Sequence, residues 1–187
     1  RRKTSEVIDP RTGGTILALY HHNGSLFAAT AGQGVFRIST ASLEPVRMED
    51  RGQLRSVNCF FSDRSGNFWM GTYDGGLVLA DDPATDTIFR IRRIFRSDGK
   101  PGRMPSNVVF AVNQSLDGTI WVATSSGLAA LKSDSTFFSF SADQGVPEVP
   151  IYAMLRDSTG EFWMTCGRGL VRFRPEGPLD GISFRTY

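Results

Sequence analysis

Residues 157–170 read DSTGEFWMTCGRGL, and related stretches occur elsewhere in the chain. Residues 63–77 read DRSGNFWMGTYDGGL, and residues 116–128 read LDGTIWVATSSGL. A weaker copy, HNGSLFAATAGQGV, occupies residues 22–35. The glycine before the aromatic residue recurs at positions 24, 66, 118 and 160, in steps of 42, 52 and 42 residues. A repeat of this length is typical of a four-stranded β-propeller blade.

Each copy is interpreted as four short strands joined by turns. An apolar strand comes first, followed by a polar turn ending in glycine, a residue that adopts positive φ without steric cost. The second strand carries the aromatic residue, and another glycine turn leads to the third strand. A more polar fourth strand closes the unit, at residues 88–91 and 182–187 of the second and fourth copies. Polarity suits an outer edge, where charge discourages unwanted strand pairing.

The pattern predicts an all-β fold, a β-propeller of four blades with four antiparallel strands each. The expected blades are about residues 16–50, 57–97, 108–141 and 151–187. Residues 1–15 are expected to be a lead-in or the end of a preceding blade. Bulky first-strand residues would crowd the axis of a four-bladed ring, and open terminal blades leave bare faces. We therefore expect part of a larger ring, or pairing with a second copy.

Charge is nearly balanced, with 21 Lys and Arg residues against 19 Asp and Glu residues. This balance argues against a nucleic-acid partner, which usually needs a concentrated basic patch. The one basic cluster, Arg90, Arg92, Arg93 and Arg96, is interpreted as edge protection on an outer strand. No segment approaches the roughly 20 apolar residues of a membrane helix, so this segment is not expected to insert into a membrane.

The sequence predicts no catalytic residue, no metal site and no cofactor. The only histidines, His21 and His22, are adjacent, and neighbouring residues on a strand point to opposite faces. Such a pair cannot easily chelate one metal ion. Asp63, Asp117 and Asp157 precede the turn glycines, where an aspartate normally accepts hydrogen bonds from backbone N–H groups.

The cysteines and tryptophans are also assigned structural roles. Cys59 and Cys166 fall on blades that are not neighbours in a larger ring, so a disulfide between them is not expected. Cys59 is interpreted as a small buried hydrophobe. The tryptophan that recurs once per blade is interpreted as an inter-blade packing residue rather than a ligand platform.

The pattern of a strand, D-x-x-G-x-Φ-W-Φ-G-T and then G-L resembles the two-component regulator propeller repeat. Residues 98–107, DGKPGRMPSN, and residues 143–147, DQGVP, are similar to the element that precedes the first strand of that repeat. The resemblance covers residues 16–187 and is most specific in the second and fourth copies. The third copy has Ala123 in place of the motif glycine, and the first has Phe27 in place of tryptophan.

The resemblance implies a non-catalytic, ligand-sensing propeller of a bacterial signal-transduction receptor that responds to carbohydrate. It also implies a periplasmic or other extracytoplasmic location, within a membrane-anchored receptor that carries a histidine kinase or other output domain. Rings of the resembled family usually have seven blades. Two alternatives stay open: a propeller enzyme, such as a lyase or glycosidase, and a protein-interaction scaffold.

Candidate contacts for a carbohydrate or other small ligand fall on one face. In a propeller, the turns between the second and third strands emerge on the same face as the loops that link consecutive blades. Loops usually carry function on a repeated scaffold. Each candidate is alternatively an ordinary exposed loop residue. The six candidates are Arg55, Tyr73, Asp74, Arg103, Ser125 and Arg168.

Overall fold

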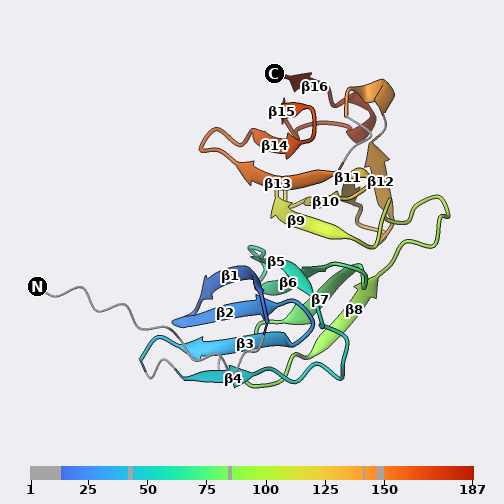
Figure 1. The fold of residues 1–187 in the computed structure, drawn as a ribbon. Coiled ribbons are helices and arrows are strands. Elements are labelled where there is room, and N and C mark those ends of the chain that lie inside the picture. Colours follow the sequence, from blue (N-terminus) through green and yellow to red (C-terminus); the bar gives the residue numbers. More distant parts are fainter. Residues whose placement is uncertain (1–13, 42–43, 84–85, 141, 147–149) are drawn as a thin grey trace, which may run out of the picture.

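The computed structural model describes residues 14–41, 44–83, 86–140, 142–146 and 150–187. The strands in these ranges form four antiparallel sheets of four strands, and neighbouring strands in each sheet are consecutive in the chain (Figure 1). Each sheet is one propeller blade. The predicted all-β fold with four four-stranded blades is confirmed.

Blade one consists of β1 (Ile16–His22), β2 (Ser25–Thr30), β3 (Gly34–Ser39) and β4 (Pro45–Arg47). Blade two consists of β5 (Val57–Ser62), β6 (Asn67–Thr72), β7 (Leu77–Asp81) and β8 (Ile91–Phe95). Blade three consists of β9 (Val109–Gln114), β10 (Ile120–Thr124), β11 (Gly127–Leu131) and β12 (Phe137–Phe140), followed by the 3-10 helix η2 (Ala142–Gln144). Blade four consists of β13 (Ile151–Arg156), β14 (Phe162–Cys166), β15 (Gly169–Phe173) and β16 (Phe184–Thr186), with the 3-10 helix η3 (Leu179–Gly181) before β16.

The first strands of the blades lie side by side along the inner edge of the row. Strand β5 contacts both β1 and β9, and β9 contacts β13. Figure 1 shows blades one and four at opposite ends of this row. The four blades therefore form an open arc, which is the geometry of part of a larger propeller.

The outer strand of blade two differs from its prediction. Strand β8 begins at Ile91, where the predicted strand 88–91 ends. Residues 87–89 instead pair in parallel with blade one: the N–H of Glu49 donates to the carbonyl of Thr87 (2.8 Å), and the N–H of Phe89 donates to the carbonyl of Glu49 (2.9 Å). The reason is the Phe89 side chain, which is buried among aromatic residues of blades one and two.

The outer strand of blade four is shorter than predicted. Strand β16 covers only Phe184–Thr186 of the predicted residues 182–187. Ile182 is buried in the core that joins blades three and four, so it leaves the sheet to fill that core. The expectation that residues 1–15 contain the end of a preceding blade concerns mostly residues 1–13, which lie outside the described residues.

Adjacent residues on the second strand of a blade pack against different neighbours. Phe68 on β6 lies in a buried cluster with Phe27 of blade one, their ring centroids 5.4 Å apart. Trp69 lies in a separate cluster with residues of β9 and β10 in blade three. Trp121 of blade three contacts Phe173 of blade four, with ring centroids 4.9 Å apart. The predicted packing role of these two tryptophans is confirmed.

Trp163 occupies the same position in blade four but is only half-buried. Its ring stacks on Tyr187 with centroids 5.9 Å apart, and the guanidinium carbon of Arg172 lies 5.4 Å from its centroid. No blade among the described residues covers this face. In blades two and three, by contrast, the following blade covers the equivalent face.

A carboxylate holds the tryptophan of blades two and four. The indole N–H of Trp69 donates to Asp63 (2.8 Å), and that of Trp163 donates to Asp157 (2.9 Å). The remaining oxygen of each carboxylate accepts backbone N–H groups of the turn at 2.9 to 3.0 Å. The predicted role of these two aspartates as turn acceptors is confirmed.

Blade three replaces this carboxylate by a hydroxyl. The indole N–H of Trp121 donates to Ser115 Oγ (3.1 Å), and Ser115 in turn donates to Asp117 (2.5 Å). Asp117 also accepts the backbone N–H of Thr119 (3.0 Å), as predicted for a turn aspartate. The residue equivalent to Asp63 and Asp157 is therefore Ser115, because it stands at the same distance before the tryptophan.

A second recurring hydrogen bond closes the turn at the other end of the second strand. In blades one to three a threonine hydroxyl donates to the carbonyl of a glycine in the turn at 2.8 to 2.9 Å. Cys166 occupies this position in blade four, with its Sγ 3.5 Å from the carbonyl oxygen of Gly169. Cys166 is therefore the blade-four equivalent of the turn threonine in blades one to three.

The motif glycine of blade two is required by close packing. A Cβ added at Gly71 would lie 2.5 Å from Val109 Cγ1 and 2.6 Å from Cys59 Sγ. Burial raises the pKa of the Cys59 thiol to about 12, so the thiol stays protonated at neutral pH and packs as an apolar group. Cys59 is only partly buried as a residue, but it packs against the core shared by blades two and three, as predicted for a small hydrophobe.

We expect Phe89→Ala to destabilise the fold by about 3 to 5 kcal/mol, the usual cost of truncating a buried phenylalanine. Phe89 is 4% exposed and contacts the rings of Phe27 (6.4 Å) and Phe68 (6.1 Å). Urea unfolding of the chain measures the effect. The neighbouring Ile88 is 49% exposed, so Ile88→Ala should change stability by less than about 0.5 kcal/mol. Equal losses in both variants would contradict the inter-blade role of Phe89.

We expect Asp157→Asn to flatten the acid limb of the stability curve. Hydrogen bonds from the Thr159 hydroxyl and the Trp163 indole lower the pKa of Asp157 from 3.8 to about 2. Because the folded-state pKa lies below the unfolded value, this contribution is complete above about pH 4 and is lost as the pH falls through about 2.

Thermal unfolding between about pH 2 and 7 compares the slopes of wild type and variant over this window. The control is Asp180→Asn, which removes an exposed carboxyl group in η3. An Asp157→Asn curve parallel to that of the wild type would contradict the proposed contribution.

Candidate functional site

Hydrogen bonds join the turns and blade-linking loops on the predicted ligand face. The carbonyl of Arg55, in the loop from blade one to blade two, accepts the N–H of Gly32 (2.9 Å) in the blade-one turn. Tyr73 N–H donates to the carbonyl of Ser56 (2.9 Å), and Ser125 N–H donates to the carbonyl of Val108 (3.0 Å). In blades one to three, the turn between the second and third strands is thus held against a loop that enters a first strand.

The six predicted contact residues lie in these loops but do not bond to one another. Tyr73 is 60% exposed, and Ser125 is half-buried with its Oγ 2.7 Å from that of Ser106. Arg103 forms a long ion pair with Asp98 (3.9 Å). Among the described residues, the six candidates therefore lie at separate positions along the arc of blades. Apart from Tyr73 and Ser125, the candidates are Arg55, Asp74, Arg103 and Arg168, and all four are exposed.

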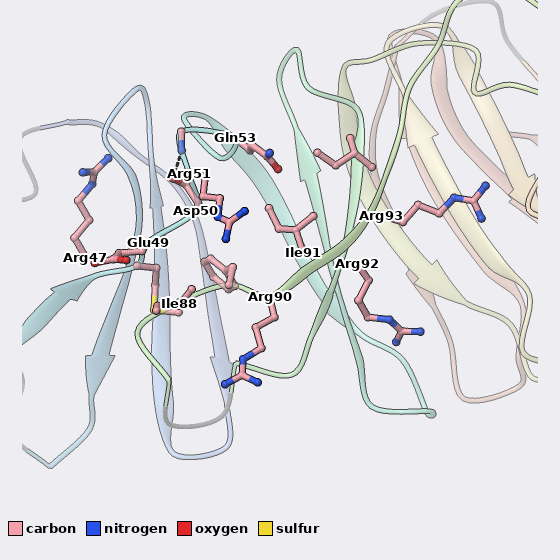
Figure 2. A pocket seen from close by; sticks show the side chains of 14 residues that line it. Arg47, Glu49, Asp50, Arg51, Gln53, Ile88, Arg90, Ile91, Arg92 and Arg93 are labelled. Carbon is pink, nitrogen blue, oxygen red and sulfur yellow. Dashed lines mark hydrogen bonds between the residues drawn. The ribbon is translucent and has the colours of Figure 1, made fainter.

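A pocket of about 1000 Å³ lies at the outer rim, between blades one and two. Figure 2 shows it between the loop that follows β4 and the segment that enters β8. One wall is residues 47–53, and the other is residues 88–94. Its volume is at the upper end of the range of about 300 to 1000 Å³ that small-molecule sites occupy. We call it the rim pocket.

Five arginines and two acidic residues line the rim pocket, together with isoleucines. Asp50 is buried, and its carboxylate accepts the backbone N–H groups of Gly52 (2.8 Å) and Leu54 (2.6 Å). Ile91 and Ile94 are half-buried. The pocket therefore combines positive charge with an apolar wall. The arginines are Arg47, Arg51, Arg90, Arg92 and Arg93.

Several of these arginines already have partners. Arg90 pairs with Asp86 (3.4 Å), and Arg92 pairs with Asp81 (3.6 Å), in both cases between exposed side chains. Arg47 donates to the carbonyl of Gln33 (3.0 Å). Arg93 lies over the ring of Phe95, and Figure 2 shows it pointing away from the pocket. Exposed ion pairs contribute little free energy, so an anionic ligand can compete with them.

The sequence prediction recognised the basic residues of β8 but not the pocket. Strand β8 is indeed the outer strand of its sheet. The hollow forms because residues 87–89 cross to blade one before β8 begins, which places Arg90 opposite the loop that carries Arg51. No local pattern in the sequence signals this crossing.

A second polar group, also missed from the sequence, lies at the other ends of the strands. His22 Nε2 lies 2.9 Å from Asp82 Oδ1, and His22 Nδ1 lies 3.3 Å from Ser62 Oγ. In the sequence, Asp82 lies 60 residues after His22, and Ser62 lies 40 residues after it. The His22 ring also stacks on Tyr20, with centroids 5.9 Å apart. The group joins blade one to blade two.

Within the described part of the chain, no group of three or more His, Cys, Asp or Glu side chains is placed to hold a metal ion. The same residues contain no helix with the length and apolar character needed to span a membrane. Both cysteines are free thiols.

Residues 53–74 match the family model described as two component regulator propeller. The second copy of the sequence repeat is therefore similar to a two-component regulator propeller repeat. The match covers β5, β6 and the turn that contains Tyr73, within the copy where the sequence resemblance is strong. The resemblance predicted from the sequence is confirmed.

Solved structures with the same fold include two receptor domains. The extracellular domain of BT4673 from B. thetaiotaomicron, assigned as a hybrid two component system, matches with a TM-score of 0.75 and 18% identity over 92% of this chain and 24% of that chain. The extracellular domain of BT3049 from B. thetaiotaomicron, assigned likewise, matches with a TM-score of 0.72 and 20% identity over 89% of this chain and 22% of that chain. This propeller chain thus spans about a quarter of the length of these relatives.

Enzymes share the architecture as well. Virginiamycin B lyase from Staphylococcus aureus matches with a TM-score of 0.64 and 11% identity, over 94% of this chain and 56% of that chain. No curated protein sequence matches the chain. Identities this low establish the propeller fold alone, and activity must be argued from the residues of the site.

Proposed function

We propose that this propeller is the ligand-sensing module of a bacterial signal-transduction receptor, that its ligand is a carbohydrate, and that the module is not catalytic. The observation that carries the proposal is the repeat at residues 53–74, whose second turn presents Tyr73 and Asp74 on the loop face. The solved relatives that are extracellular receptor domains support the sensing role. The proposed location is periplasmic or otherwise extracytoplasmic, within a membrane-anchored receptor.

The loop face suits binding better than turnover. Tyr73 offers an exposed ring beside the carboxylate of Asp74, and Arg55 lies in the adjacent loop. An exposed aromatic ring with neighbouring hydrogen-bonding groups can contact both the apolar face and the hydroxyls of a sugar. Hydrogen bonds between threonine hydroxyls and glycine carbonyls hold the turns after the second strands in blades one to three.

We expect Tyr73→Ala and Arg55→Ala to weaken glycan binding about tenfold or more each, the effect of losing a central contact. Calorimetric titration of the chain with glycans selected from an array measures this. Arg174→Ala is the matched control, because Arg174 is exposed in the loop after β15, at the other ends of the strands. Equal affinity of all three variants and the wild type would refute a ligand site at these residues.

One observation favours the alternative of a propeller enzyme. The Ser62–His22–Asp82 group has the residue types of a nucleophile, a base and an orienting carboxylate. It lies at the opposite ends of the strands from the loop face, and the imidazole packs against Tyr20, so we assign it to inter-blade stability. We expect incubation with bound glycans to release no product. Product formation that His22→Asn abolishes would establish the enzyme instead.

A further inference from the structure

The rim pocket contains none of the predicted ligand contacts, but one loop of the chain joins the pocket to them. The loop 48–56 lines the pocket with Arg51 and Gln53 and reaches the loop face at Arg55. The carbonyl of Gln53 would lie 3.8 Å from a Cβ on Gly75, which follows Asp74 in the blade-two turn. A chain-like ligand on the loop face can therefore extend into the rim pocket.

Arg51 lines the rim pocket and has an unusual backbone conformation. It is exposed and forms no ion pair with any residue that the structure describes. Its φ is 55°, a left-handed conformation that disfavours residues other than glycine and asparagine. The turn is imposed by the Asp50 carboxylate, which accepts the N–H groups of Gly52 and Leu54. A buried carboxylate thus holds an unpaired guanidinium at the mouth of the pocket.

Arg90 lies on the other wall of the rim pocket, and Figure 2 shows its side chain extending away from Arg51. The ion pair of Arg90 with Asp86 is between side chains that are 70% and 53% exposed, so water competes with it. Figure 2 shows Arg51 extending from its loop toward Ile91, the residue next to Arg90. Guanidinium groups bind planar anions such as carboxylates through paired N–H donors, and they bind sulfate by the same donors.

We propose that the rim pocket binds the acidic group of a glycan, a uronate carboxylate or a sugar sulfate, through Arg51, with Ile91 and Ile94 against the sugar ring. That the ligand is a sugar rests on the proposed function, whereas its acidic group is inferred from the charge of the pocket. The inference narrows the ligand class from carbohydrate to acidic carbohydrate.

The test titrates the whole chain with three labelled oligosaccharides of equal length: an oligogalacturonide, a sulfated chondroitin fragment and a neutral malto-oligosaccharide. We expect at least one acidic probe to bind more tightly than the neutral one. Arg51→Ala should weaken acidic binding by about tenfold or more, since hydrogen bonds to a charged group are lost. The two acidic arms distinguish carboxylate from sulfate.

Two further variants separate recognition from fold and from general charge. Arg185→Ala removes an exposed arginine from β16, an outer strand like β8, and should change acidic binding by less than about twofold because it contacts no ligand. Arg51→Lys keeps the charge but loses the paired donors, and it should bind the acidic probe with intermediate affinity. Thermal unfolding confirms that each variant is folded.

Three outcomes overturn the inference. Equal binding of neutral and acidic probes, unaffected by the rim variants, refutes it and leaves the proposed function standing. Polyglutamate that binds as tightly as the acidic glycans and loses affinity in the same variants assigns the pocket to acidic peptides instead. Failure of every oligosaccharide, in a glycan array as well, refutes the inference together with the proposed function.

Discussion

Every blade must cover two faces of a four-stranded sheet, and this constraint organises the whole molecule. The second strand meets it with two adjacent residues, since neighbouring side chains on a strand point to opposite faces. Phe68 packs with blade one and Trp69 with blade three, and Ile120 and Trp121 divide in the same way between blades two and four. Blade four has no neighbour on one face among the described residues, and its Trp163 is half-exposed there.

The hydrogen bonds at the two ends of the second strand serve this packing. At one end, the indole N–H donates a hydrogen bond that fixes the position of the ring, and the acceptor is Asp63, Ser115 or Asp157. At the other end, a threonine hydroxyl closes the turn. Because these bonds are made inside each blade, the loops between blades are free to vary in length and sequence. That freedom is what makes the loop face suitable for recognition.

The rim pocket shows how an irregularity on this scaffold creates a surface. Residues 87–89 leave blade two and pair with Glu49, which buries Phe89 between the blades and separates β8 from the loop after β4. The exposed edge then carries arginines over an apolar wall. The same charges that discourage strand pairing at an outer edge are therefore available to an acidic ligand.

The sequence by itself determined the repeat, the strand order within each blade and the packing role of Trp69 and Trp121. These follow from a local pattern, because strand alternation and glycine turns are short-range properties. It also identified the turn aspartates, although Ser115 in blade three was hidden because a hydroxyl replaces the carboxylate. Only the tertiary structure decided the crossing of residues 87–89, the contact of His22 with Ser62 and Asp82, and the rim pocket. Each of these depends on residues about 40 to 60 positions apart, which are brought together by the stacking of blades that repeat at that spacing.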